Sequence, residues 1–184
     1  KQKNLFSKKY SINFKRGKKF ILVTCHRRES FGEGFLNICE AIKAIAKKNK
    51  NVEFIFPVHL NPNVQRPVFR LLNNVQNIKL IPPQEYVPFI FLMKNSYLIL
   101  TDSGGVQEET PSLGKPVLIM RNNTERPEGV IAGTSILVGT ETKKIISEVE
   151  ELLNNKTKYK KIANSANPYG DGNSSQTIYE HIFK

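Results

Sequence analysis

The stretch over residues 98–109, LILTDSGGVQEE, constrains the fold more than any other part of the chain. Its apolar start is short and is followed at once by polar residues, as expected of an inner strand in a parallel sheet. Asp102 and Ser103 are both suited to cap a helix, and Gly104 and Gly105 allow a ligand to come close to the backbone. The stretch therefore predicts a strand, a tight turn and the first turn of a helix, a geometry that favours an anion.

Glu108 and Glu109 follow within the predicted helix, and their carboxylates bear on what such a turn binds. They would repel a phosphate if they pointed at it, but they can accept hydrogen bonds from the hydroxyls of a sugar. One interpretation is therefore a site for a nucleotide or a nucleotide sugar. The other is an ordinary helix cap in an α/β protein, and the stretch alone favours neither.

Short apolar runs alternate with amphipathic segments along most of the chain. The predicted strands cover residues 20–24, 53–58, 78–81, 98–100, 117–120 and 135–138. The predicted helices lie around residues 35–46, 64–73, 86–94, 145–153, 159–166 and 174–183, besides the one that begins at the glycine turn. This alternation predicts an α/β fold with one parallel sheet covered by helices on both faces. Ligands of such sheets bind beyond the carboxyl ends of the strands.

The domain is expected to span residues 18–184, after a polar lead-in or linker over residues 1–17 that lacks a clean hydrophobic period. Ser174 or Ser175 is expected to cap the last helix. Cys25 and Cys39 form neither a disulfide framework nor a metal-binding pattern, and Cys39 falls on the apolar face of a helix. A reducing, cytoplasmic location without a bound metal is the simplest interpretation.

The chain carries a net charge of +12, which permits a nucleic-acid partner. Its lysines are scattered, however, and no basic motif interleaved with stacking aromatic residues is present. We therefore interpret the charge as solvated surface and expect no nucleic-acid partner. No apolar run approaches the ~20 residues that span a bilayer, and no secretory signal is recognisable, so no membrane association is expected.

Polar clusters follow four of the predicted strands, around His26, His59, Ser103 and Arg126. In the first cluster, HRRE, the two guanidiniums suit phosphate oxygens, and the imidazole can donate to a phosphate or move a proton. The alternative is a surface loop with an internal Arg–Glu pair. His59 is as compatible with a loop histidine as with a ligand contact. Arg126 has the reach for a diphosphate, or it forms a surface salt bridge.

Aromatic residues on the helix after residue 85 have two possible roles as well. Tyr86 and Phe89 are able to stack on a base, although their helical spacing with Ile90 and Met93 is more typical of core residues. No spacing of histidines and carboxylates indicates a metal site.

Seven blocks carry a resemblance to a known family: HRRESFG (26–32), PVHLNP (57–62), PQEY (83–86), LTDSGGVQEE (100–109), PSLGKPV (111–117), TERPEG (124–129) and NPYGDG (167–172). In this order they resemble the non-hydrolysing bacterial UDP-N-acetylglucosamine 2-epimerases. The resemblance implies a GT-B-type fold, in which two Rossmann-like, doubly wound domains face a cleft, and this chain would be the C-terminal domain. It implies a homodimer when the chain is full length, and the interconversion of UDP-GlcNAc and UDP-ManNAc by elimination and re-addition of UDP. It implies no cofactor.

The resemblance also implies roles for single residues. Ser103, Gly104 and Gly105 would hold the diphosphate, Glu109 would bind the ribose hydroxyls, and Phe89 would line the uracil site. Arg126 would contact UDP. His26 would lie by the diphosphate and assist the departure of UDP. Arg27 and His59 would face a second, regulatory UDP-GlcNAc site.

Members of that family are roughly twice as long as this chain, and only their second half is matched. The carboxylates that move the C2 proton would lie in the missing N-terminal domain, against which the last helix, residues 174–183, would normally pack. The chain alone is therefore expected to bind UDP weakly and to be inactive. Two alternatives stay open: another GT-B enzyme using UDP-sugars, either a glycosyltransferase or a related diacetamido-uronate epimerase, or a non-enzymatic module that binds polyanions.

Overall fold

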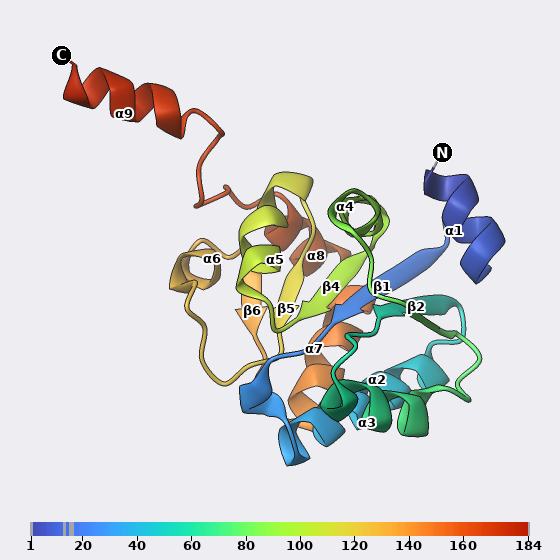
Figure 1. Ribbon diagram of the computed structural model, residues 1–184. Helices are drawn as coiled ribbons and strands as arrows, with labels where there is room; N and C mark the ends of the chain where they lie inside the picture. Colours follow the sequence, from blue (N-terminus) through green and yellow to red (C-terminus); the bar gives the residue numbers. More distant parts are fainter. Residues whose placement is uncertain (1, 13, 15–16, 184) are drawn as a thin grey trace.

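The computed structural model describes residues 2–12, 14 and 17–183. Within them, six strands form one sheet in the order β3-β2-β1-β4-β5-β6, and every neighbouring pair is parallel (Figure 1). The strands are β1 Lys19–Thr24, β2 Val52–Pro57, β3 Ile78–Ile81, β4 Leu98–Thr101, β5 Val117–Ile119 and β6 Ser135–Leu137. All the predicted strands are confirmed, with small differences at their ends. The order is that of a Rossmann-like, doubly wound sheet, whose direction of winding reverses between β1 and β4.

Helices cover both faces of the sheet, as the alternating pattern predicted. On one face lie α2 Glu33–Lys48, α3 Pro62–Leu72, α7 Thr142–Asn154 and α8 Lys156–Ala163. On the other face lie α1 Gln2–Tyr10, α4 Tyr86–Asn95 and α5 Gly104–Glu109. The remaining elements are the short η1 Arg28–Ser30 and η2 Pro111–Leu113, then α6 Pro127–Ile131 and the last helix, α9 Ser174–Ile182.

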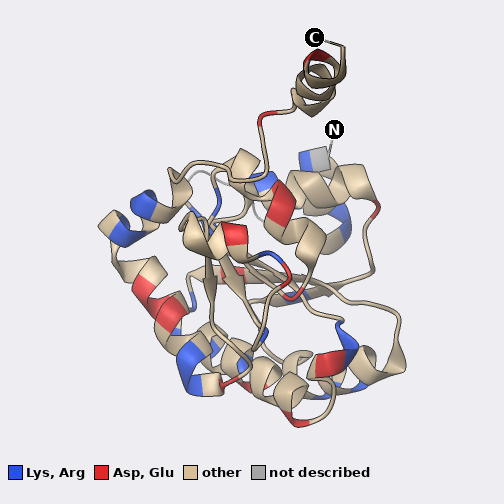
Figure 2. Cartoon of the chain, turned by 90° about the vertical axis from the view of Figure 1, so that its left-hand side faces the viewer, with Lys and Arg blue, Asp and Glu red and all other residues tan. Residues whose placement is uncertain are grey.

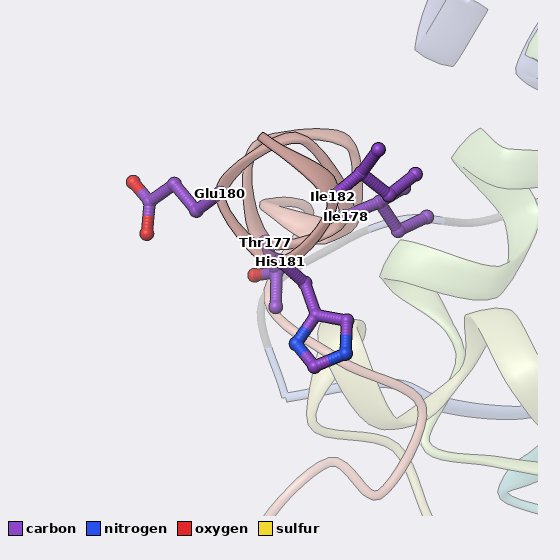
Figure 3. A pocket seen from close by; sticks show the side chains of 5 residues that line it. All are labelled: Thr177, Ile178, Glu180, His181 and Ile182. Carbon is purple, nitrogen blue, oxygen red and sulfur yellow. The ribbon is translucent and has the colours of Figure 1, made fainter. Parts of the chain in front are cut away.

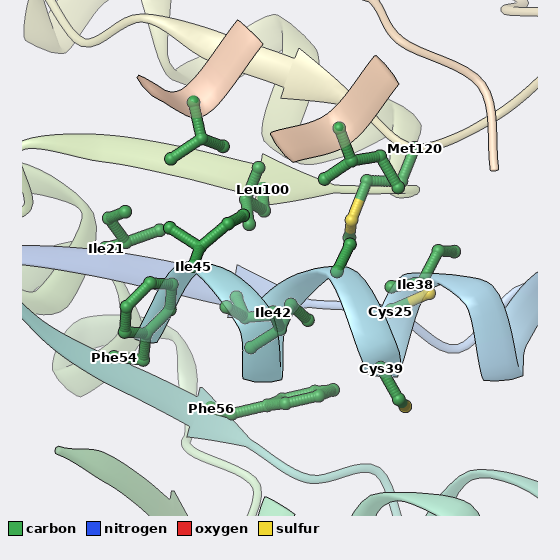
Figure 4. Close-up of a cluster of buried hydrophobic side chains, with 14 of the residues drawn as sticks. Ile21, Cys25, Ile38, Cys39, Ile42, Ile45, Phe54, Phe56, Leu100 and Met120 are labelled. Atoms are coloured by element: carbon green, nitrogen blue, oxygen red, sulfur yellow. The ribbon is translucent and has the colours of Figure 1, made fainter. Parts of the chain in front are cut away.

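The larger core lies between the sheet and α2. Ile38, Ile42 and Ile45 recur at helical spacing on α2 and are fully buried against the strands, where they meet residues such as Phe54 (Figure 4). Burying each of these side chains contributes roughly 1.5–3 kcal/mol. Cys39 is confirmed as a core residue, because its side chain is fully buried in this cluster. Burial raises the pKa of its thiol to about 12, so the thiol keeps its proton.

The lead-in differs from the sequence-based expectation. Within residues 1–17, of which 1, 13, 15 and 16 lie outside the described residues, α1 places Phe6 in the second core at 0% exposure. Its ring stacks on Phe91, with 5.8 Å between centroids and 5° between planes. Ile12, beyond the helix, is also buried. The sequence pattern missed this packing because the stacking partner of Phe6, Phe91, comes from a distant part of the chain.

Two boundaries were also predicted differently. No helix was predicted between the strands at 117–120 and 135–138, yet α6 begins there at Pro127, a residue whose fixed φ suits a first helical turn. The N-cap of α9 is Asn173, in place of the predicted Ser174 or Ser175.

The last helix projects away from the rest of the chain (Figure 1). The large hydrophobic residues in this helix and directly after it are exposed: Ile178, Tyr179, Ile182 and Phe183. Ile178 and Ile182 point to the same side of the helix, whereas Glu180 points to the opposite side (Figure 3). The helix is therefore amphipathic, and nothing in the described part of the chain covers its apolar side.

Charged residues are spread over many elements of the molecule (Figure 2). None of the helices in residues 2–12 and 17–183 combines the length and the hydrophobicity that a membrane span requires. Among the same residues, no group of three or more histidine, cysteine, aspartate or glutamate side chains is arranged to hold a metal ion.

Candidate functional site

Four of the predicted site residues meet at the carboxyl ends of β1, β2 and β4. His26, His59, Phe89 and Ser103 line one hollow of about 240 Å³. The other lining residues come from the ends of β1 and β2, from the segment between β3 and α4, and from α5: Thr24, Cys25, Pro57, Pro83, Gln84 and Val106. This is the position at which the winding of the sheet reverses, where ligands of doubly wound sheets bind. A larger hollow beside α9 is lined by residues of that single helix and is open surface.

Asp102 holds the loop that follows β1. Its side chain is fully buried, and Oδ2 accepts hydrogen bonds from the backbone N–H groups of His26 and Arg27, both at 2.7 Å. The thiol of Cys25 donates to the same oxygen at 3.1 Å. The prediction that Asp102 caps a helix is therefore wrong: its carboxylate joins the end of β4 to the loop after β1. Burial and this carboxylate raise the pKa of Cys25, so the thiol keeps its proton.

The start of α5 is open to a ligand. Ser103 occupies the N-cap position, as predicted, but its side chain makes no capping hydrogen bond. A Cβ added at Gly105 would meet nothing within 4 Å, and one at Gly104 would lie 3.7 Å from the guanidinium of Arg27. Backbone N–H groups and a cation therefore converge on the same space, as an anion requires.

The two glutamates of α5 have different neighbours. Glu108 accepts a hydrogen bond from Arg126, which lies at the N-cap of α6. The charge of Glu109 raises the pKa of the Tyr86 hydroxyl, which hydrogen-bonds to it at the start of α4. Phe89 lies one turn further along α4 and lines the hollow. The carboxylate of Glu109, at the end of α5, therefore faces the start of α4, the helix that also carries Phe89.

Arg121 ties the loop after β5 to the loop after β1, a role that sequence reasoning missed. Its side chain is 4% exposed and donates to Glu29 of the loop after β1 and to Glu125, each through Nη2 at 3.1 Å. Arg27 lies 3.7 Å from the same Glu125 carboxylate. The sequence signal was a single arginine after a strand, which does not distinguish a buried anchor from a surface residue.

Arg121→Met is expected to lower the free energy of unfolding and to make that free energy depend less on pH in acid. The hydrogen bond and charge of Arg121, followed by the charge of Arg27, lower the pKa of Glu125 from its ordinary 4.5. A carboxylate whose pKa is lower in the folded state stabilises the fold at pH values above its unfolded-state pKa. This contribution is lost as the pH falls through the folded-state pKa. Without Arg121, two carboxylates lose a buried donor, so the free energy of unfolding measured in urea at pH 7 should fall by about 1–3 kcal/mol. That free energy should also decline less steeply between pH 5 and pH 3.

The exposed Arg66 on α3 supplies the control, since Arg66→Met removes the same charge away from this cluster. It should change the unfolding free energy by less than about 0.5 kcal/mol. Equal acid profiles for the Arg121 variant and the unmodified chain would show that the Arg121–Glu125 pair does not stabilise the fold.

Two of the blocks identified in the sequence contact each other. The backbone N–H of Gly129, in TERPEG, donates to the hydroxyl of Tyr169, in NPYGDG, at 3.1 Å. A Cβ at Gly129 would lie 2.7 Å from that hydroxyl oxygen, so any larger residue here would have to displace the Tyr169 side chain. The contact fixes α6, and with it Arg126, against the segment that leads to α9.

Comparison with known proteins supports the resemblance. The family model described as UDP-N-acetylglucosamine 2-epimerase matches residues 1–183. The UDP-N-acetylglucosamine 2-epimerase of Salmonella typhimurium is 56% identical over 165 residues, which are 90% of this chain and 44% of that protein. The crystal structure of the Neisseria meningitidis UDP-GlcNAc 2-epimerase bound to UDP-GlcNAc is 50% identical, with a TM-score of 0.91 over 98% of this chain and 48% of that chain.

A more distant structure shows the fold alone. The C-terminal domain of a group 1 glycosyltransferase from Francisella tularensis is 16% identical, with a TM-score of 0.64 over 100% of this chain and 92% of that chain. The fold is thus that of the C-terminal domain of a GT-B-type protein. The chain spans about half the length of the epimerases that it matches. It belongs to the UDP-N-acetylglucosamine 2-epimerase family and corresponds to the C-terminal half of those relatives.

Proposed function

We propose that this chain is the UDP-binding half of an epimerase that interconverts UDP-GlcNAc and UDP-ManNAc by eliminating UDP and adding it back. The observation that carries the proposal is the convergence of His26, Arg27 and the open start of α5 where the sheet reverses its winding. Membership of the epimerase family supports it, as does the Neisseria meningitidis relative, which binds UDP-GlcNAc.

The diphosphate would lie at the start of α5, where Gly104 and Gly105 offer backbone N–H groups and Ser103 offers its hydroxyl, since the N–H of Ser103 is already donated to Thr101. Negative charge develops on the departing diphosphate as its bond to the sugar breaks, and preorganised donors stabilise that charge. His26, which lines the same hollow, would donate a hydrogen bond to the diphosphate and so assist the departure of UDP.

The nucleoside would extend toward α4. Phe89 presents a ring at the hollow for the uracil, and Glu109 offers a carboxylate to the ribose hydroxyls. Arg126 would reach UDP by dividing its donors between the ligand and Glu108, which the five N–H groups of a guanidinium permit.

Arg27 and His59 would face a second, regulatory UDP-GlcNAc molecule. His59 lies at the far side of the hollow from Ser103, after β2, and Arg27 lies on the same loop as His26. This assignment rests on the family resemblance, and the positions of both residues beside the proposed diphosphate site support it.

The carboxylates that exchange the C2 proton would come from the N-terminal half of the enzyme. Glu108 and Glu109 do not fit that role, since one is paired with Arg126 and the other lies beside Tyr86. The N-terminal half would also cover the exposed apolar side of α9. We further propose that the full-length protein assembles as a homodimer, acts in the cytoplasm and takes part in cell-envelope polysaccharide synthesis.

Isothermal titration calorimetry with UDP tests the proposal on the 184-residue chain. We expect weak binding, with Kd on the order of 0.1–1 mM, because one wall of the cleft is missing. A coupled assay for UDP-ManNAc should show no turnover. Absence of binding at 10-fold higher UDP would overturn the site, whereas turnover by this chain would overturn the assignment of the proton-moving carboxylates to the other half.

A further inference from the structure

The second oxygen of Asp102 has no hydrogen-bond partner. The side chain is 0% exposed, and although Oδ2 accepts three hydrogen bonds, Oδ1 is buried and accepts none. A buried carboxylate oxygen without a donor is unfavourable by roughly 1–3 kcal/mol or more. Nδ1 of His26 lies 3.7 Å from Oδ1, so a ring movement of about 1 Å would form the missing hydrogen bond.

His59 is held in the opposite arrangement. Its Nδ1 accepts a hydrogen bond from the backbone N–H of Asn61 at 3.1 Å, which requires Nδ1 to be free of a proton. The neutral ring must then carry its proton on Nε2. The two imidazoles are stacked, with 5.4 Å between centroids and 18° between planes. Each ring therefore has a different neighbour at Nδ1, an acceptor for His26 and a donor for His59.

We propose that Asp102 is a positioning residue that acts through His26: it accepts the Nδ1–H of the imidazole, so that Nε2 is the nitrogen presented to the ligand. His59, fixed by Asn61, presents Nε2–H to the same hollow. The pair would thus offer one defined donor and one nitrogen free to accept or, when protonated, to donate. The consequence for a diphosphate rests on the function proposed above, but the tautomers themselves do not.

This role separates Asp102 from a purely structural loop anchor. The anchor function needs only Oδ2, which holds two backbone N–H groups, and an amide oxygen would serve it as well. The positioning function needs an acceptor at Oδ1, which an amide NH₂ cannot provide. Asp102→Asn therefore keeps the anchor and removes the acceptor, and it should leave Nδ1 of His26 unprotonated and move the proton to Nε2.

Imidazole ¹H–¹⁵N NMR of the UDP-free chain measures the tautomers directly. The chain has three histidines, so His26→Gln and His59→Gln assign the signals. In the unmodified chain, neutral His26 is expected as the Nδ1–H tautomer and His59 as Nε2–H. In Asp102→Asn, His26 should change to Nε2–H while His59 is unchanged. Asp171→Asn removes the same charge from the exposed segment before α9 and should change neither.

Two results would overturn the proposal: an Nε2–H tautomer for His26 in the unmodified chain, or retention of Nδ1–H in a folded Asp102→Asn variant. If that variant does not fold, the tautomers of the unmodified chain still decide. Addition of UDP then separates the two proposals. Shifts at Nε2 of His26 with Nδ1–H retained support both, whereas correct tautomers that do not respond to millimolar UDP support the Asp102–His26 pair and contradict the UDP site.

Discussion

Ser103→Trp is expected to lower the affinity of this chain for UDP by at least about 10-fold, and so to bring it below detection in calorimetry. Ser103 lines the hollow of about 240 Å³ and stands at the N-cap of α5, where the diphosphate is proposed to lie. An indole at this position would occupy the space above the open N–H groups of the helix. The loss would be steric, so the unfolding free energy should change little.

Ser147→Trp is the matched control, because Ser147 is exposed on α7 and does not line the hollow. It should bind UDP as the unmodified chain does. The pair of variants also tests the alternative of a polyanion-binding module, which would bind RNA in a salt-sensitive way whether or not Ser103 is replaced. Unchanged UDP affinity in Ser103→Trp would contradict the placement of the diphosphate.

Phe54→Ala is expected to reduce the free energy of unfolding by about 3–5 kcal/mol. Phe54 lies at the centre of β2, between β1 and β3, and is 0% exposed in the larger core (Figure 4). Loss of its ring removes buried apolar surface and leaves a cavity that the sheet and α2 cannot fully close. Because a domain is stable by only about 5–15 kcal/mol, urea unfolding should show a large shift of the midpoint with the slope nearly unchanged.

Phe183→Ala makes the same chemical change at a side chain that is 72% exposed, just beyond α9. In this chain it should alter the unfolding free energy by less than about 0.5 kcal/mol. If α9 packs on the N-terminal half of the enzyme, as proposed, the same substitution should weaken association with that half. Similar destabilisation by the two alanine variants would show that the two phenylalanines are equally packed, contrary to the structure.

Much of the fold could be predicted from the chain alone, because the signals were local. The short apolar runs located all the strands, and helical spacing on residues such as Ile38, Ile42 and Ile45 located the covering helices. Polar residues at strand ends located the hollow, since parallel strands place their carboxyl ends at one edge. Four predicted residues do line it together, including His59, for which the residues alone favoured no role.

The missed features share a physical cause. The packing of Phe6 depends on Phe91, and the position of Arg121 depends on Glu29, a residue 92 positions away. Asp102 was taken for a helix cap because its type and position fit one, yet its partners lie more than 70 positions earlier, at His26 and Arg27. Local periodicity and capping rules contain no information about such long-range partners.

The sequence by itself determined the class of the fold, the location of the polar clusters and, through seven ordered blocks, the family. Only the tertiary structure decided the order of the strands, which places β1 beside β4 and so brings the His26 loop to the Ser103 turn. It also decided that the carboxylate of Asp102 faces that loop, and that the apolar side of α9 faces no other element of the described chain. The physical reason is that strand order and side-chain partners are set by contacts between distant segments, whereas periodicity reports only which side of each segment is buried.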